Sequence, residues 1–336
     1  MYSVYSLGSF GYTLGHEKTL MLFSVFQRAS FQNRPEHLNS MKGEFAMGKV
    51  ITRRDFIRGS TFAVLGAALG FSSQQEKKSK VILVRHKDAL DENSVLNAEV
   101  IQQMLDEAVM ALFNKPDPVE AFKQIIKPGE VVGIKSNVWS YLPTPPEAEK
   151  AIVRRLVDVG VKEEDISIDD HNVRTNPIFL KATSLINVRP LRTHYLAGVS
   201  GCMKNYIMFA QSQSAMHPNS CSDLGSLFYL PQVKGKTRLN ILCALTPQYH
   251  GRGPHHFSRR YIWDYKGLIV GQDPVAVDAI GLKLIMAKRT EQLGKDMAVP
   301  PVPRHIRDAD LKHGLGTSDL NRIDLVKLGW KDDILI

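Results

Sequence analysis

Short apolar segments alternate along this chain with longer segments whose apolar residues recur every three or four positions. The helical spacing is clearest at residues 93–113, and further helices are predicted at 119–126, 145–159 and 274–288. The short segments, typical of buried strands, are 81–85, 130–135, 166–169, 185–188, 239–245, 267–270 and 321–328. This alternation predicts an α/β fold, in which helices flank a largely parallel sheet in three layers.

A pair of arginines, Arg53 and Arg54, precedes a short apolar stretch at residues 61–71. The stretch is shorter than the about 20 apolar residues that cross a bilayer. A basic start, an apolar middle and small residues at the exit follow one another in the order of a signal peptide. We therefore expect residues 47–72 to be a twin-arginine signal peptide and the protein to be exported, to the periplasm or beyond, by the twin-arginine translocation machinery. The alternative is an ordinary buried helix with a basic start.

The remaining divisions of the chain follow from this signal. Residues 1–46 show no sustained hydrophobic period, and Met47 would be a natural start. We expect residues 1–46 to be an extension produced by a misassigned start codon, with a genuine long leader as the alternative. Residues 73–80 are expected to be a linker and 81–336 a single α/β domain. No other apolar stretch is long enough for a permanent membrane span.

Charge and cysteine content narrow the function classes. The formal net charge is +9, of which +4 falls within residues 1–71 and +5 in the rest, without a basic stripe. A mildly basic domain suits a small anionic ligand, and nucleic-acid binding is not expected. Cys202, Cys221 and Cys243 form no C-x-x-C motif, so neither an intrinsic iron–sulfur cluster nor a zinc ribbon is expected. Cys243, in an apolar run, is expected to be a half-buried small residue without a chemical role.

Polar side chains follow several of the predicted strands. The carboxyl ends of parallel strands meet at one edge of a sheet, where ligands bind. The residues expected to meet there are Lys135, Asn137, Asp170, His171, Arg189, Arg192, His194, Asp273 and Asp278. Each has a simpler alternative: Asp273 precedes Pro274 and could be only a helix N-cap, and paired acidic residues after a strand are often a turn.

Three roles are predicted for these residues and for two glycine-containing segments, 198–205 and 251–254. Carboxylates and imidazoles suit proton transfer and hard divalent metals, whereas lysine, asparagine and bare backbone amides suit an anion. Proton transfer is expected of Asp170, His171, His194 and Asp273. Ligand binding is expected of Lys135, Asn137, Lys204, Asn205 and Gly253. The candidate metal ligands are Asp170, His171, Asp273 and Asp278.

Five segments together resemble family 362 of the domains of unknown function. They are 132–137, 185–194, 203–205, 251–254 and 267–278, and the Asp-Pro-Val-Ala-Val-Asp run at 273–278 is the most specific. The resemblance covers about residues 81–330. Members of that family often have Lys-Pro-Asn at the positions of Lys135-Ser136-Asn137, a lysine at that of Arg192, and an acidic residue near the position of Cys243. Some relatives carry ferredoxin-like cysteine motifs, which this chain lacks, and no settled activity comes with the family.

These observations predict an exported enzyme that acts on a small anionic ligand, with a divalent metal as one option for its cofactor. The alternative is a non-catalytic binding protein or a partner of an iron–sulfur redox system. The sequence leaves the substrate, the reaction and the oligomeric state open.

Overall fold

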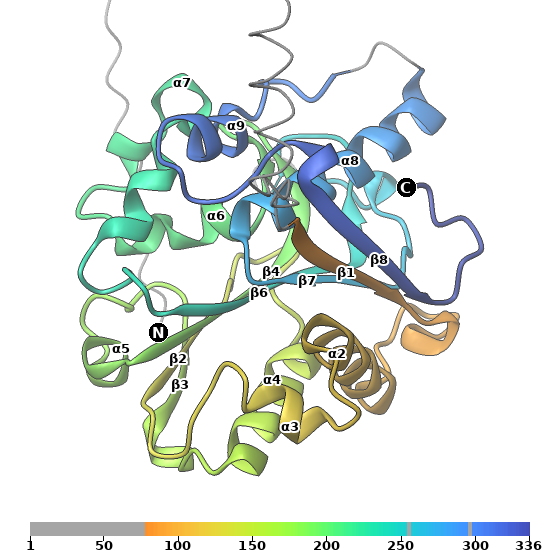
Figure 1. The fold of residues 1–336 in the computed structure, drawn as a ribbon. Helices are drawn as coiled ribbons and strands as arrows, with labels where there is room; N and C mark the ends of the chain where they lie inside the picture. Colours follow the sequence, from red (N-terminus) through yellow and green to blue (C-terminus); the bar gives the residue numbers. More distant parts are fainter. Residues whose placement is uncertain (1–77, 254–256, 295–297) are drawn as a thin grey trace, which may run out of the picture. The chain divides into compact units, whose positions relative to one another are not determined.

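The computed structural model describes residues 78–253, 257–294 and 298–336 (Figure 1). The predicted extension, signal peptide and first part of the linker lie outside these residues. All of the described residues belong to one compact unit of the chain, Ser73–Ile336. Among the described helices, none is both long and apolar enough to cross a bilayer.

A mixed sheet of eight strands forms the centre of the described unit. The strands are β1 (Ser79–Arg85), β2 (Val132–Lys135), β3 (Ile166–Asp169), β4 (Ser184–His194), β5 (Gly198–Ser200), β6 (Thr237–Gln248), β7 (Gly267–Gly271) and β8 (Ile323–Gly329). Their order is β3-β2-β4-β6-β7-β1-β8, with β5 paired to β4. Six strands run in one direction, and β5 and β7 run against their neighbours. The predicted α/β fold with a largely parallel sheet is therefore confirmed.

Helices cover both faces of this sheet (Figure 1). One face carries α2 (Ala98–Phe113), α3 (Pro118–Phe122) and α4 (Pro146–Val159). The other carries α6 (Cys202–Asn205), α7 (Pro218–Cys221), α8 (Pro274–Leu293) and α9 (Arg304–Leu311), and α5 (Pro177–Lys181) lies beside the β2–β3 end. Side chains of β1 alternate between the two cores, with Val81 and Leu83 in one and Ile82 and Val84 in the other. The three predicted layers follow from this period of two.

The helix ends follow local signals in the sequence. The side chain of Asn97 accepts hydrogen bonds from the amides of Glu99 and Val100 and starts α2, which therefore begins later than residue 93. The α4 helix has proline in its first turn and ends at Gly160, whose φ of +102° suits glycine.

The direction of β7 was not as expected. We expected its carboxyl end to lie at the same edge of the sheet as the carboxyl ends of the other strands. The segment between β6 and β7 contains no α-helix in its described residues, only a short turn at Arg259–Tyr261. A parallel neighbour needs a crossover, usually through a helix, whereas an antiparallel neighbour needs only a loop. The chain thus returns antiparallel, and Gly271 at the end of β7 pairs with Asn240 near the start of β6.

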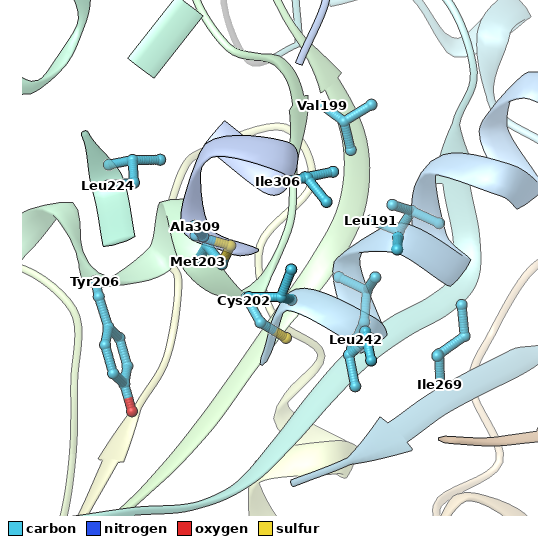
Figure 2. Close-up of a cluster of buried hydrophobic side chains, with 14 of the residues drawn as sticks. Leu191, Val199, Cys202, Met203, Tyr206, Leu224, Leu242, Ile269, Ile306 and Ala309 are labelled. Atoms are coloured by element: carbon cyan, nitrogen blue, oxygen red, sulfur yellow. The ribbon is translucent and has the colours of Figure 1, made fainter. Parts of the chain in front are cut away.

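The core around α6 joins the sheet to α8 and α9. Cys202 and Met203 of α6 pack with Leu242 of β6 and Ile306 of α9 (Figure 2). All three cysteines are buried and free, and Cys243 is more deeply buried than expected. The short helix α6, which no sequence pattern predicted, is thus held by packing from both sides.

A close contact between α8 and the sheet gives a stability prediction. A Cβ at Gly281 would lie 2.5 Å from Leu242 Cδ2 and 3.2 Å from Leu191 Cδ1, both on buried side chains. We expect Gly281→Ala to lower the free energy of unfolding by about 1–2 kcal/mol, because overpacking outweighs the gain in helix propensity. Urea denaturation measures this. The control Thr290→Ala, at an exposed position of the same helix, should not destabilise, and equal behaviour of the two variants would contradict the close packing.

Candidate functional site

A cavity of about 340 Å³ opens where β2, β3 and β4 end and α6 begins. We call it the central pocket. Its polar lining includes six residues that are at least nine-tenths buried, Asn137, Asp170, Arg189, Arg192, Lys204 and Asn205. The predicted residues from three different strand ends therefore do meet at one edge.

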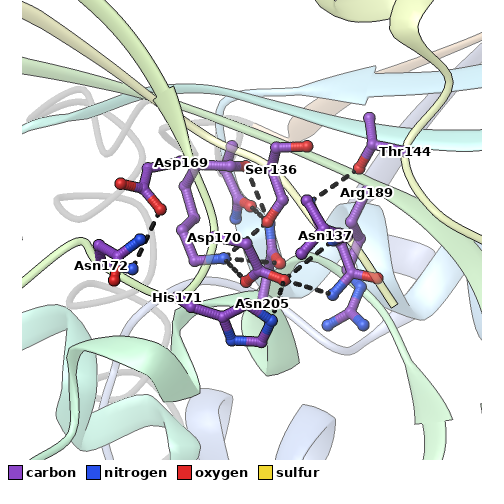
Figure 3. Close-up of polar contacts among 12 residues, drawn as sticks. Ser136, Asn137, Thr144, Asp169, Asp170, His171, Asn172, Arg189 and Asn205 are labelled. Carbon is purple, nitrogen blue, oxygen red and sulfur yellow. Dashed lines mark hydrogen bonds and ion pairs between the residues drawn. The ribbon is translucent and has the colours of Figure 1, made fainter. Parts of the chain in front are cut away.

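A buried ion pair joins Lys135 to Asp170 of the pocket lining, and Figure 3 shows the polar contacts around Asp170. Lys135 Nζ lies 2.5 Å from Asp170 Oδ1, and it also donates to Ser136 O at 2.6 Å and to Asn205 Oδ1 at 3.3 Å. Burial lowers the pKa of Lys135 to about 8, although the carboxylate of Asp170 opposes this shift. Burial alone would raise the pKa of Asp170, but Lys135 holds it below its ordinary value. Both groups are therefore charged at neutral pH.

The second oxygen of Asp170 fixes the loop that follows β2. Asp170 Oδ2 accepts the amide of Val138 at 2.9 Å and Asn137 Nδ2 at 3.5 Å. The side chain of His171 is half exposed, with Nε2 3.8 Å from the same oxygen. Asp170 thus positions Lys135 and the loop, and its oxygens are occupied by these donors.

Two buried arginines of β4 bring positive charge to the pocket without a described carboxylate to neutralise it. Arg189 and Arg192 are 3% and 1% exposed, and burial lowers the pKa of both. Arg192 Nη2 donates to Asn137 Oδ1 at 2.7 Å, and Arg189 Nη1 donates to Gly201 O at 3.3 Å. Within the described part of the chain, the Nε of each arginine and the Oγ of Ser200 have no hydrogen-bond partner. Neither arginine forms an ion pair with a described carboxylate, so both bring uncompensated positive charge to the pocket lining.

Lys204 and two histidines complete the polar lining. Lys204 Nζ lies 3.0 Å from His217 Nε2, and burial, with the nearby Arg189 and Arg192, lowers the pKa of Lys204 to about 8. Burial and Lys204 lower the pKa of His194 to about 2, so its imidazole is neutral. His194 Nδ1 accepts the amide of Leu196 at 3.1 Å, which assigns the proton to Nε2.

Asp278 holds the helix that carries Lys204. Its carboxylate accepts the amide of Cys202 at 2.6 Å and that of Met203 at 3.0 Å. Glycine at 201 is required here because a Cβ would lie 2.2 Å from Asp278 Oδ1. Burial raises the pKa of Asp278 to about 7. Asp278 is therefore a positioning residue beneath the pocket, with both oxygens already bonded.

Asp273 does not reach the central pocket, because β7 runs opposite to β4 and β6. It caps α8, accepting the amides of Val275 and Ala276 at 2.9 and 3.0 Å, and its other oxygen accepts from Ser79 Oγ and the amide of Thr317. The expectation that Asp273 lies with Asp170 and His171 was wrong, and the simpler N-cap interpretation holds. The four proposed metal ligands do not come together. No group of three or more His, Cys, Asp or Glu that could hold a metal occurs within the described ranges.

Gly253 also lies outside the lining of the central pocket. Its φ is +73°, and a Cβ there would lie 2.4 Å from Thr193 O, so the close approach of two backbones requires glycine. The ligand-binding expectation for Gly253 thus has no contact to support it.

Sequence reasoning placed Arg189 and Arg192 at this edge without giving them a role, and it gave none to Ser200 or His217, which also line the pocket. The strand predicted at 185–188 extends to His194 with every residue buried, so both arginines lie within it. The sequence did contain a signal for the two arginines, because they follow directly after an apolar strand. Members of the resembled family also often have a lysine at the position of Arg192.

The bonds to Asp278 allow a test of its positioning role. Asp278→Ala leaves two buried amides of α6 without an acceptor, so we expect the free energy of unfolding to fall by about 2–4 kcal/mol. Urea denaturation measures the change, with Asp324→Ala at an exposed position of β8 as the control. Unfolding curves that coincide for the two variants would show that α6 does not depend on this cap.

Comparison with known proteins identifies the chain at the family level. Residues 143–283 match the family described as "Domain of unknown function (DUF362)". No curated protein and no solved structure matches the chain. The matched segment contains Asp170, Lys204 and Asp278. The protein therefore contains a segment, residues 143–283, that matches the DUF362 family.

Proposed function

We propose that the central pocket binds a small anion and that the protein is an enzyme acting on it. One observation carries this proposal: Arg189, Arg192 and Lys204 are buried around the cavity, and none of them forms an ion pair with a described carboxylate. A buried charge left uncompensated costs free energy, which a bound anion would recover.

The charge balance of the pocket supports an anionic ligand. Lys135 is neutralised by Asp170. Arg189, Arg192 and Lys204 form no ion pair of 4 Å or less with any described carboxylate. Asp278 is close enough to influence Arg189, but its oxygens are held by α6. Arginine side chains that are buried and pre-ordered bind carboxylate and phosphate groups through charge-assisted hydrogen bonds.

Proton transfer is the chemistry that the remaining groups can supply. Lys204, with its pKa lowered to about 8, can exchange a proton near neutral pH, and His217 lies 3.0 Å away as a partner. His194 is a neutral donor through Nε2, suited to hold a ligand oxygen without changing charge. The metal-assisted version of this proposal rests on Asp170 and His171 alone, since Asp273 and Asp278 are engaged elsewhere.

Sulfate and inorganic phosphate test the proposed anion site by titration calorimetry. We expect both to bind the purified chain, and Arg192→Gln to weaken binding roughly 10- to 100-fold, the worth of one charged hydrogen bond. Lys181→Gln removes an exposed cation away from the pocket and should leave affinity unchanged. If neither anion binds, or if both variants bind as tightly as the unmodified chain, the proposal fails. A ligand that binds but is released unchanged would make the protein a binding protein instead.

The pH dependence of sulfate binding tests the part assigned to Lys204. Sulfate keeps its charge between pH 6 and 9, so only the protein titrates. Lys204 is charged below its pKa of about 8 and neutral above it, so its contribution to affinity should be lost as pH rises through 8. Lys204→Gln should bind more weakly and lose most of this dependence. If the affinity of Lys204→Gln falls with pH as steeply as that of the unmodified chain, the titrating group is Lys135 instead.

We also propose that the protein is exported by the twin-arginine route. The support is the order of Arg53, Arg54 and the apolar stretch 61–71, all outside the described residues. In a bacterium with this pathway, Arg53→Lys combined with Arg54→Lys should retain the protein in the cytoplasm, while Arg58→Lys should not. Cell fractionation measures retention. Mass spectrometry of the exported chain should find a start near residue 72, and a start before Met47 would refute the proposed signal.

A further inference from the structure

Apolar and aromatic side chains line the central pocket in addition to the cationic ones. Trp139, Tyr195, Ile207 and Met208 line the same cavity. Trp139 and Tyr195 are 39% and 37% exposed, which is high for large aromatic side chains beside buried arginines. A site for a bare inorganic ion would gain nothing from such a surface.

Groups of the polar site fix the positions of both aromatic residues. The ring of Tyr195 stacks on that of His194 with centroids 5.1 Å apart, and His194 stacks in turn on His217 at 6.3 Å. Trp139 follows Val138, whose amide binds Asp170. The loop that carries Trp139 is closed by the bond from the Thr144 amide to Asn137 O at 2.8 Å. The aromatic surface and the cations are thus parts of one ordered structure.

The size of the cavity also exceeds that of an inorganic anion. Its volume of about 340 Å³ falls at the lower end of the range for organic ligands, roughly 300–1,000 Å³. Phosphate or sulfate would occupy only the region beside the arginines and leave the aromatic part open to water.

We propose that the ligand is a small organic anion with a phosphate or carboxylate head and a flat, aromatic body. Arg189, Arg192 and Lys204 hold the head, and Trp139 and Tyr195 pack against the body. This inference rests on the proposed function, because it assigns the head group to the same anion site.

Matched pairs of probes test the inference by titration calorimetry on the purified chain. Phenyl phosphate and methyl phosphate share a phosphate head, and benzoate and acetate share a carboxylate head. The difference in affinity within a pair therefore measures the contribution of the aromatic body. The difference between the pairs shows which head group the site prefers. We expect the aromatic member of at least one pair to bind about tenfold more tightly, the magnitude of one good aromatic contact. Trp139→Ala should abolish most of this preference and leave methyl phosphate or acetate binding unchanged, while Trp139→Phe should retain part of it.

Tyr141 provides the matched control on the same loop. It is 60% exposed, stacks on Phe257 at 5.2 Å and does not line the cavity, so Tyr141→Ala should keep the preference. Equal affinities within both pairs, while the anions themselves bind, would overturn this inference and leave the proposed anion site standing. The same holds if Trp139→Ala keeps the full preference. Absence of binding by every probe, sulfate included, would overturn both.

Discussion

The buried ion pair of Lys135 and Asp170 is the interaction on which the site depends. Moving two charges out of water costs several kcal/mol, which their attraction offsets only when all other hydrogen bonds are made. Here the ammonium group of Lys135 has three acceptors, and the carboxylate of Asp170 accepts from Lys135, Asn137 and the amide of Val138. The pair therefore joins the ends of β2 and β3 and orders the loop beyond β2. Through Asn205 it also orders α6 (Figure 3).

The cations of β4 and α6 are arranged differently from this neutralised pair. Burial lowers the pKa values of Arg189, Arg192 and Lys204. Arg189 lowers that of Arg192 further, and both arginines lower that of Lys204. Such an arrangement reduces the stability of the ligand-free protein, and an anion that binds only the folded state would restore it. Pre-ordered donors of this kind also stabilise negative charge without reorganisation, which is the main electrostatic advantage of an enzyme site. Cations without a described counter-charge therefore line the cavity in which the proposed ligand would bind.

Much of the fold and part of the site could be predicted from local patterns. The predicted strands at 81–85, 166–169 and 267–270 match β1, β3 and β7 closely, because a period of two and bounding turn residues are local properties. Lys135 and Asp170 were correctly expected to meet, since β2 and β3 are parallel neighbours. Asp273 was misplaced because the direction of β7 depends on the connection from β6. That connection lacks a helix in its described residues. The sequence predicted no helix there either, and this already indicated an antiparallel return.

The sequence by itself determined the elements, their caps and the candidate residues that directly follow parallel strands. These features depend on neighbours within a few positions, which is why Asp273 is a helix cap wherever β7 lies. Only the tertiary structure decided which charges are paired. Asp170 neutralises Lys135 from an adjacent strand, Asp278 is bound to the amides of α6, and Arg192 has no acidic partner within 4 Å among the described residues. Charge balance in a pocket is set by distances between segments remote in sequence, and no local pattern encodes those distances.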